Sequence, residues 1–129
     1  MKSASFDYQR VPTLDEAIRL LGPEAGSGEQ FGDYVAKPCS GCQSLGPMLN
    51  LRLAQVDRLI DLRQIPELRT VLLSKSSLRI GAATTHAQIE DGLLADVTHG
   101  LLPSVAAGIA YRAVRNRGTL GGSLAHADP

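Results

Sequence analysis

Apolar side chains near the N-terminus recur at the spacing of one helical face: Leu14, Ala17, Ile18 and Leu21. Thr13 and Glu16 form the pattern of a capping box at the start of this run, in which each side chain satisfies a backbone N–H of the other residue. Gly22 followed by Pro23 is typical of a helix end. We therefore predict a helix that begins after Thr13 and ends at Gly22. Residues 24–33, rich in glycine, serine and charge, are predicted to form an exposed loop.

The pattern then changes to that of a strand, a turn and a second helix. Residues 34–39 form a short strand-like run, and residues 45–53 carry apolar side chains at helical spacing: Leu45, Met48, Leu49 and Leu53. Pro47 is compatible with this helix because N–H groups in a first turn have no intrahelical partner. Residues 59–62 form another strand, so we predict a β-α-β unit with parallel strands.

The second half of the chain alternates short strands with helices. Residues 69–73 and 78–83 are strand candidates separated by a polar turn, a spacing that predicts an antiparallel hairpin. Thr85 with Gln88 forms a second capping-box pattern and opens a short helix. A longer helix is predicted over residues 103–114. These elements predict an α+β fold with a β-α-β lobe at residues 1–65 and an α+β lobe at residues 66–129, between which a ligand could lie.

Two segments of small and hydroxylated residues stand out from this pattern, one in each predicted lobe. The first is Ser40, Gly41, Cys42, Gln43 and Ser44, and the second is Thr119, Leu120, Gly121, Gly122 and Ser123. Glycine lets backbone N–H groups approach an anion closely, and successive N–H groups beside a helix start form an anion-binding concavity. Paired loops of this kind suit a diphosphate. The alternative is that these glycines only form turns.

Composition and charge narrow the classes of partner. The chain has 129 residues, 43% of them apolar and 4% aromatic, with 13 basic residues balancing 13 acidic ones. A balanced charge gives no broad positive field, so nucleic acid is an unexpected partner. No stretch approaches the roughly 20 apolar residues that span a bilayer, and no hydrophobic signal region is evident. We therefore expect a cytoplasmic protein without membrane insertion.

Arginines and cysteines supply the remaining candidate chemistry. Arg112, Arg115 and Arg117 could hold phosphate or could satisfy carbonyls at a helix C-terminus. Cys39 and Cys42 form one C-x-x-C, a spacing found in zinc half-sites and in redox centres. A zinc site needs further ligands, and the three histidines have no ligand spacing. We therefore expect no metal site, and we expect both thiols to be free in a reducing compartment. A further hypothesis is a thiol switch, in which oxidation of the two cysteines distorts the first glycine segment.

The two glycine segments, the Arg79-Ile80-Gly81-Ala82 hairpin and the terminal run from Arg115 to Pro129 resemble one known family. This is the FAD-binding medium subunit of the molybdenum hydroxylases, the relatives of xanthine dehydrogenase and aerobic carbon monoxide dehydrogenase. The resemblance covers nearly the whole chain. It implies a PCMH-type FAD-binding fold, with both segments on the FAD diphosphate through hydroxyl and backbone N–H groups.

The resemblance also implies a role in electron transfer. A large partner subunit with a molybdopterin cofactor would hydroxylate the substrate, a small partner with [2Fe–2S] clusters would relay the electrons, and FAD would pass them to an external acceptor. The flavin supplies the redox chemistry. We therefore nominate no catalytic residue in this chain.

Two features depart from the family pattern. Cys42 stands where the family most often has glycine, and a left-handed conformation there would cost about 1–2 kcal/mol and weaken binding about tenfold. The family pattern also continues for about as many residues again beyond Pro129, so the chain is expected to be truncated. The alternative interpretation is therefore a remnant or assembly fragment that does not hold flavin.

Overall fold

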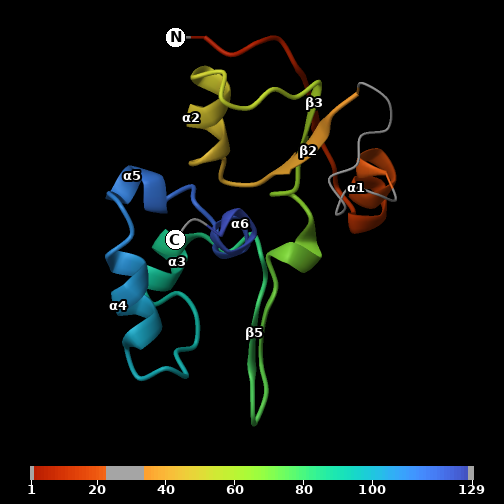
Figure 1. The fold of residues 1–129 in the computed structure, drawn as a ribbon. Coiled ribbons are helices and arrows are strands. Elements are labelled where there is room, and N and C mark those ends of the chain that lie inside the picture. Colours follow the sequence, from red (N-terminus) through yellow and green to blue (C-terminus); the bar gives the residue numbers. More distant parts are fainter. Residues whose placement is uncertain (1, 23–33, 128–129) are drawn as a thin grey trace.

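The computed structural model describes residues 2–22 and 34–127, so the predicted loop at residues 24–33 lies outside the described residues. Strands and helices alternate in the first half of the chain, and a pair of strands followed by short helices makes up the second half (Figure 1). In order, the elements are β1 (Asp7–Arg10), α1 (Leu14–Leu21), β2 (Ala36–Cys39), α2 (Leu45–Asn50), β3 (Arg58–Asp61), the 3₁₀ turn η1 (Pro66–Leu68), β4 (Val71–Leu73), β5 (Leu78–Ile80), α3 (His86–Glu90), α4 (Leu101–Ala107), α5 (Arg112–Arg115) and α6 (Leu120–His126).

The first half of the chain is organised around a parallel sheet with strand order β1-β3-β2. The central strand β3 pairs with β2 from Ala36↔Arg58 to Cys39↔Asp61, which confirms the predicted parallel β-α-β unit. It also pairs with β1, which the sequence pattern did not predict. Most of β1 is exposed, so its residues lack the alternation that marks a half-buried strand.

Two small cores lie on the two faces of this sheet, because side chains alternate between faces along β3. On the α1 side, Ile60 packs with Val11, Ala17 and Ile65. On the α2 side, Leu59 packs with the second core, whose other buried members are Cys39, Leu49 and Val56. The figure places α1 and α2 on opposite sides of the strands (Figure 1).

The first helix begins and ends where its sequence signals predicted, although only one of the two bonds of the predicted capping box is formed between Thr13 and Glu16. The Glu16 N–H donates to Thr13 Oγ1 at 3.3 Å, and Gly22 ends the helix at a φ of 81°. The positive φ explains why glycine occupies that position. Helix α2 is shorter than predicted and ends at Asn50 rather than near residue 53.

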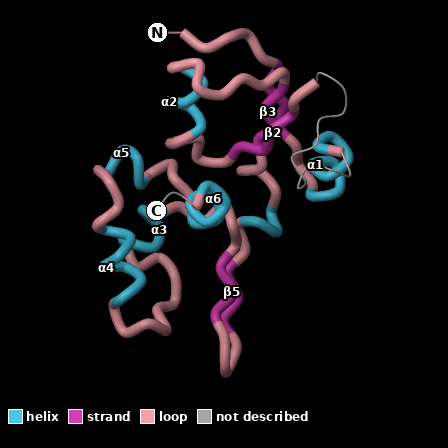
Figure 2. Tube along the Cα trace, in the orientation of Figure 1, coloured by secondary structure: helices cyan, strands magenta, loops and turns pink. Residues whose placement is uncertain are grey.

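The β4–β5 pair is the predicted antiparallel hairpin, and it extends away from the rest of the molecule (Figure 2). Its turn is closed by the Ser74 N–H, which donates to the Ser77 carbonyl at 2.8 Å. After it, α3 begins with a complete capping box: Thr85 Oγ1 accepts from the Gln88 N–H, and Gln88 Oε1 accepts from the Thr85 N–H. This second capping-box prediction is therefore confirmed.

The long helix predicted over residues 103–114 is wrong. The chain forms α4 and α5 instead, separated by Gly108 and by Ala110, whose φ is 45°. A left-handed residue cannot continue an α-helix, so the chain turns here. None of the helices in the described part of the chain is long and apolar enough to span a membrane.

Candidate functional site

The first glycine segment is a loop that connects the end of β2 to the start of α2. Cys39 is the last strand residue, and Ser44 is the N-cap position of α2. Cys42 has a φ of 54°, which is the left-handed conformation considered from the sequence. The Gln43 side-chain amide donates to the Gly41 carbonyl at 2.8 Å and so braces the loop internally.

This loop carries polar groups that have no partner in the described part of the chain. The hydroxyl of Ser40 is buried and makes no hydrogen bond. No described residue accepts a hydrogen bond from the backbone N–H groups of residues 41–44. Buried polar groups are nearly always satisfied, so an orphaned hydroxyl beside consecutive free N–H groups indicates a ligand position. The chemistry of these donors matches a phosphate.

The second glycine segment is not a loop. Thr119 is the N-cap of α6, and its hydroxyl accepts from the Gly122 N–H at 3.1 Å. Residues 120–123 form the first turn of that helix. The sequence indicated a loop here because two adjacent glycines disfavour a helix by about 1 kcal/mol each, and neighbouring segments override this preference.

Those neighbouring segments also occupy the N–H groups at the start of α6. The Leu120 N–H donates to the Thr84 carbonyl and the Gly121 N–H donates to the Ala82 carbonyl, both at 2.9 Å. His86, which is buried, makes a 2.9 Å hydrogen bond to Ser123 Oγ through its Nε2. The N–H groups of the first segment therefore have no partner in the described chain, whereas those at the start of the second are engaged with protein carbonyls.

Glycine is required in both segments by contact with other parts of the chain. A Cβ on Gly41 would lie 2.1 Å from the Arg117 carbonyl oxygen, and a Cβ on Gly121 would lie 2.5 Å from the Cβ of Ala82. Both distances are far inside van der Waals contact. Gly41 thus lets the first loop lie directly against the backbone that leads into α6, which brings the two segments together.

The two segments face a common hollow of about 490 Å³. Its walls include residues 40–44 on one side and Gly118, Thr119, Gly122 and Ser123 on the other. Leu120 and Gly121, the other two candidate residues, are not among the lining residues. A hollow of this size falls within the range of small-molecule and cofactor sites.

A larger hollow of about 750 Å³ lies beside the segment between β5 and α3. It is lined by residues that include Arg63, Arg69 and Arg117, and it contains none of residues 40–44. The orphaned hydroxyl and the free N–H groups belong to the smaller hollow. The smaller hollow is therefore the candidate ligand site.

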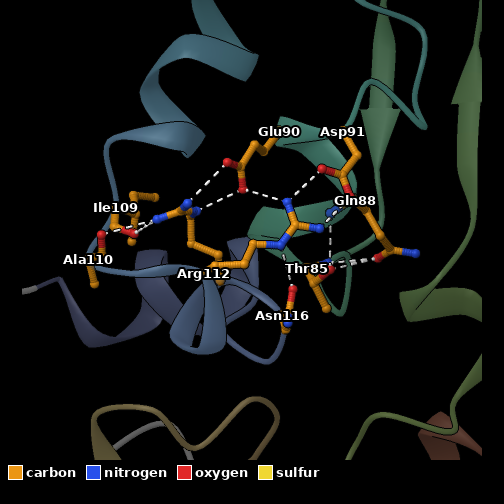
Figure 3. Close-up of polar contacts among 9 residues, drawn as sticks. Thr85, Gln88, Glu90, Asp91, Ile109, Ala110, Arg112 and Asn116 are labelled. Carbon is orange, nitrogen blue, oxygen red and sulfur yellow. Dashed lines mark hydrogen bonds and ion pairs between the residues drawn. The ribbon is translucent and has the colours of Figure 1, made fainter.

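Two of the three candidate arginines are held by carboxylates rather than free to bind phosphate. Arg112 donates to Asp91 Oδ1 and Oδ2, both at 2.6 Å, and to Glu90 at 3.0 Å (Figure 3). Arg115 donates to Glu90 at 2.7 Å and to the carbonyls of Ile109 and Ala110, just beyond the end of α4. Of the two roles open from the sequence, the structure therefore supports carbonyl capping for Arg115.

Cys42 in the first segment and Cys39 just before it have shifted thiol pKa values. Cys42 is free and half-buried, and Cys39 is free and buried. A hydrogen bond from Cys39 and the nearby charges of Arg63 and Arg117 lower the pKa of Cys42 to about 7, against the opposing effects of burial and Asp61. The same hydrogen bond, together with burial, raises the pKa of Cys39. Cys42 is the more reactive thiol of the two because it ionises first.

Among the residues that the structure describes, no group of three or more His, Cys, Asp or Glu side chains could hold a metal ion.

Burial lowers the pKa of His86, so its imidazole stays neutral at pH 7 and orients Ser123. Sequence reasoning did not select His86 for this role. The available signal was its position directly after Thr85 in the capping-box pattern.

Comparison with known proteins shows the family to which the chain belongs. Residues 4–129 match the family described as "FAD binding domain in molybdopterin dehydrogenase". The chain belongs to this family. Its α+β, PCMH-type fold, with a parallel β-α-β part followed by an antiparallel hairpin and helices, is confirmed by the solved structures it resembles.

Three similar proteins illustrate the family. The 6-hydroxypseudooxynicotine dehydrogenase complex subunit alpha of Paenarthrobacter nicotinovorans is 40% identical over 99% of this chain and 40% of its own length. The carbon monoxide dehydrogenase medium chain of Hydrogenophaga pseudoflava is 40% identical over 96% of this chain and 40% of its own length. The crystal structure of quinoline 2-oxidoreductase from Pseudomonas putida 86 has a TM-score of 0.82, with 40% identity over 99% of this chain and 42% of that chain. The chain thus spans about 40% of the length of the curated relatives it matches.

Replacing Cys42 by glycine, the residue that the sequence resemblance led us to expect there, should leave the free energy of unfolding unchanged or raise it by up to about 1 kcal/mol. Glycine removes the left-handed strain but adds backbone entropy to the unfolded chain. Replacing Cys42 by valine should lower the free energy of unfolding by about 1–2 kcal/mol, because β-branched residues tolerate a positive φ least. Urea unfolding of both variants checks this, and equal effects would contradict the strain argument.

Proposed function

We propose that this chain is the FAD-binding part of an electron-transfer component in a molybdenum-dependent hydroxylase or dehydrogenase. In this proposal the FAD diphosphate lies in the hollow between the two glycine segments, and hence between the predicted lobes 1–65 and 66–129. FAD would accept electrons from [2Fe–2S] clusters and pass them to an external acceptor. The chain itself contributes binding and orientation, and no catalytic residue is assigned to it.

The observation that carries this proposal is the set of unpaired donors in the first segment. The buried Ser40 hydroxyl and the free N–H groups of residues 41–44 would donate to phosphate oxygens. The second segment contributes differently from the sequence expectation. Its N–H groups at Leu120 and Gly121 are engaged with protein carbonyls, so Thr119, Gly122 and Ser123 would form a preformed wall.

Cys42 has a φ of 54°, so the left-handed conformation considered from the sequence is present in this loop. The glycine and valine variants of Cys42 measure its expected cost of about 1–2 kcal/mol. The intact loop and the family membership support the flavin-binding function over a remnant that holds no flavin.

Partners and location extend the same proposal. The relatives include medium chains and subunits of dehydrogenase complexes. We propose that the protein assembles with a molybdopterin-binding large subunit and a [2Fe–2S] small subunit, and that the large subunit determines the substrate. A cytoplasmic location is consistent with the two free thiols, which persist in reducing compartments.

Replacing Ser40 by alanine tests the function through two effects of opposite sign. Without FAD, the variant should have a free energy of unfolding equal to or slightly higher than that of the unaltered protein, because an unsatisfied buried hydroxyl is removed. Its affinity for FAD should fall about tenfold or more, because a hydrogen bond to a charged phosphate is worth about 1.5–3 kcal/mol. Urea unfolding measures the first effect, and quenching of flavin fluorescence on titration measures the second.

Ser76→Ala is the matched control, since Ser76 is exposed in the β4–β5 turn, outside the residues that line the hollow. It should change neither quantity. The protein expressed from its full gene should be yellow with bound FAD. A colourless protein that binds no FAD on titration would contradict the proposal, as would Ser40→Ala binding FAD as tightly as the unaltered protein.

A further inference from the structure

The two cysteines lie at the base and the turn of the proposed diphosphate loop. Cys39 ends β2 and is buried in the core beneath α2, and Cys42 packs against that same core from the loop above. Both cysteines line the hollow, but Cys39 is buried and Cys42 is only half-buried, so Cys42 is the more accessible thiol of the pair. The left-handed conformation at Cys42 is the backbone feature that sets the direction of this turn.

We propose that Cys39 and Cys42 form a reversible disulfide under oxidation by a peroxide, and that this bond lowers the affinity of the hollow for FAD. The inference rests on the proposed function for its consequence, although formation of the bond does not. The site is thus an oxidative modification site built into a cofactor-binding loop.

The chemistry of the step is complete with peroxide as the oxidant. The Cys42 thiolate attacks one peroxide oxygen, the O–O bond breaks, and hydroxide leaves, giving a sulfenic acid at Cys42. The Cys39 sulfur then attacks the Cys42 sulfur, the S–O bond breaks, and water leaves as the Cys39 proton is transferred. Two thiols and one hydrogen peroxide become one disulfide and two waters, so the two cysteines lose the two electrons that reduce the peroxide.

The surroundings favour Cys42 as the attacking group. Its pKa of about 7 keeps a substantial thiolate fraction at neutral pH, mainly because Cys39 donates a hydrogen bond to it, with a further contribution from Arg63 and Arg117 that burial and Asp61 oppose. Cys39 remains protonated beside it, which makes Cys39 the resolving thiol. A reactive, accessible thiol next to a buried one is the arrangement of a redox-sensitive pair.

The loop has little freedom to absorb this bond without a change at the hollow. Gly41 lies between the two cysteines and is in direct contact with the Arg117 carbonyl on its far side. A bond that draws Cys42 toward Cys39 therefore moves the N–H groups of residues 41–44 relative to the fixed start of α6. Those N–H groups are the proposed phosphate donors.

The test uses the protein expressed from its full gene, treated with hydrogen peroxide and, in parallel, with diamide, which joins paired thiols. Mass spectrometry should show loss of two hydrogens and a Cys39–Cys42 linked peptide. The affinity for added FAD should fall at least about tenfold and recover with dithiothreitol. FAD bound beforehand should slow formation of the bond, because it covers Cys42.

Cys39→Ala supplies the matched control, since it keeps a small apolar side chain in the core and leaves Cys42 in place. Under reducing conditions it should bind FAD as the unaltered protein does, and diamide should not change that affinity. Absence of the linked peptide overturns the inference, and so does a disulfide-containing protein whose FAD affinity is unchanged. A reduced protein that binds no FAD contradicts the proposed function instead, so the two failures are distinguishable.

Discussion

Replacing Gly41 by alanine is expected to abolish FAD binding and to lower the free energy of unfolding by about 3 kcal/mol. The added Cβ would lie 2.1 Å from the Arg117 carbonyl oxygen and 2.8 Å from the Gly118 Cα, and both neighbours are backbone atoms that no side-chain rotation can move. Overpacking of this kind typically costs about 1–3 kcal/mol. To relieve it, the loop must separate from the segment that leads into α6, and the two walls of the hollow separate with it.

Gly46→Ala is the matched control for this prediction. Gly46 lies in α2, only five positions along the chain, and a Cβ there would meet nothing within 4 Å. Alanine is the better helix former by about 1 kcal/mol, so this variant should be as stable as the unaltered protein or more so. Thermal unfolding and flavin titration measure both variants. Equal behaviour of Gly41→Ala and Gly46→Ala would show that the contact with Arg117 does not hold the site together.

Replacing Asp61 by asparagine is expected to destabilise the chain by about 2 kcal/mol at neutral pH. Asp61 is fully buried at the end of the central strand and accepts hydrogen bonds from Tyr8, Arg10 and Arg63, the last at 2.8 Å. These bonds connect β1, β3 and the chain that leaves the sheet. The asparagine side chain keeps the shape of aspartate but carries no charge. Its NH₂ group is itself a hydrogen-bond donor and would face the donors that now bind the carboxylate.

The effect of Asp61 should depend on pH in one direction. Burial alone would raise the pKa of Asp61, but the hydrogen bonds from Arg63 and Tyr8 outweigh it and hold that pKa well below its ordinary value. A carboxylate with a lowered folded pKa stabilises fully above its unfolded pKa of about 3.9 and loses that contribution as the pH falls further. The difference between the variant and the unaltered protein should therefore be constant from pH 7 to 5 and shrink below about pH 4.

Urea unfolding at pH 7, 5, 3.5 and 2.5 measures this difference. Asp7→Asn serves as the control, because Asp7 lies on the neighbouring strand with 72% of its side chain exposed and an ion pair at 3.5 Å. Exposed ion pairs contribute little, so that variant should remain within about 0.5 kcal/mol. A difference for Asp61→Asn that grows on acidification would contradict the assigned role.

Local signals in the sequence predicted the elements that depend on few neighbours. The capping patterns at Thr13 and Thr85 marked the starts of α1 and α3, and the polar turn between β4 and β5 marked the hairpin. The first glycine segment was also placed correctly as a loop between strand and helix. In these cases the conformation is determined by interactions between residues only a few positions apart in the sequence.

The missed features depend on contacts between distant residues. Strand β1 forms because it pairs with β3, some fifty positions away, and its own side chains carry no strand pattern. Helix α6 begins at Leu120 despite two glycines because Thr84 and Ala82 accept its first N–H groups. The contact of Gly41 with Arg117, which brings the site together, has no local signal at all.

Because the N–H groups at the start of α6 are occupied, the two sides of the hollow should tolerate amino-acid substitutions to different extents. On the α6 side, a substitution that changes ligand contacts also disturbs bonds to Ala82 and Thr84, so stability limits what that side can become. On the side of residues 40–44, the backbone N–H groups and the Ser40 hydroxyl have no partner in the described chain. Variation that adjusts how tightly a ligand is held should therefore accumulate in the first segment, and a laboratory library aimed at altered affinity is best confined to Ser40, Cys42, Gln43 and Ser44.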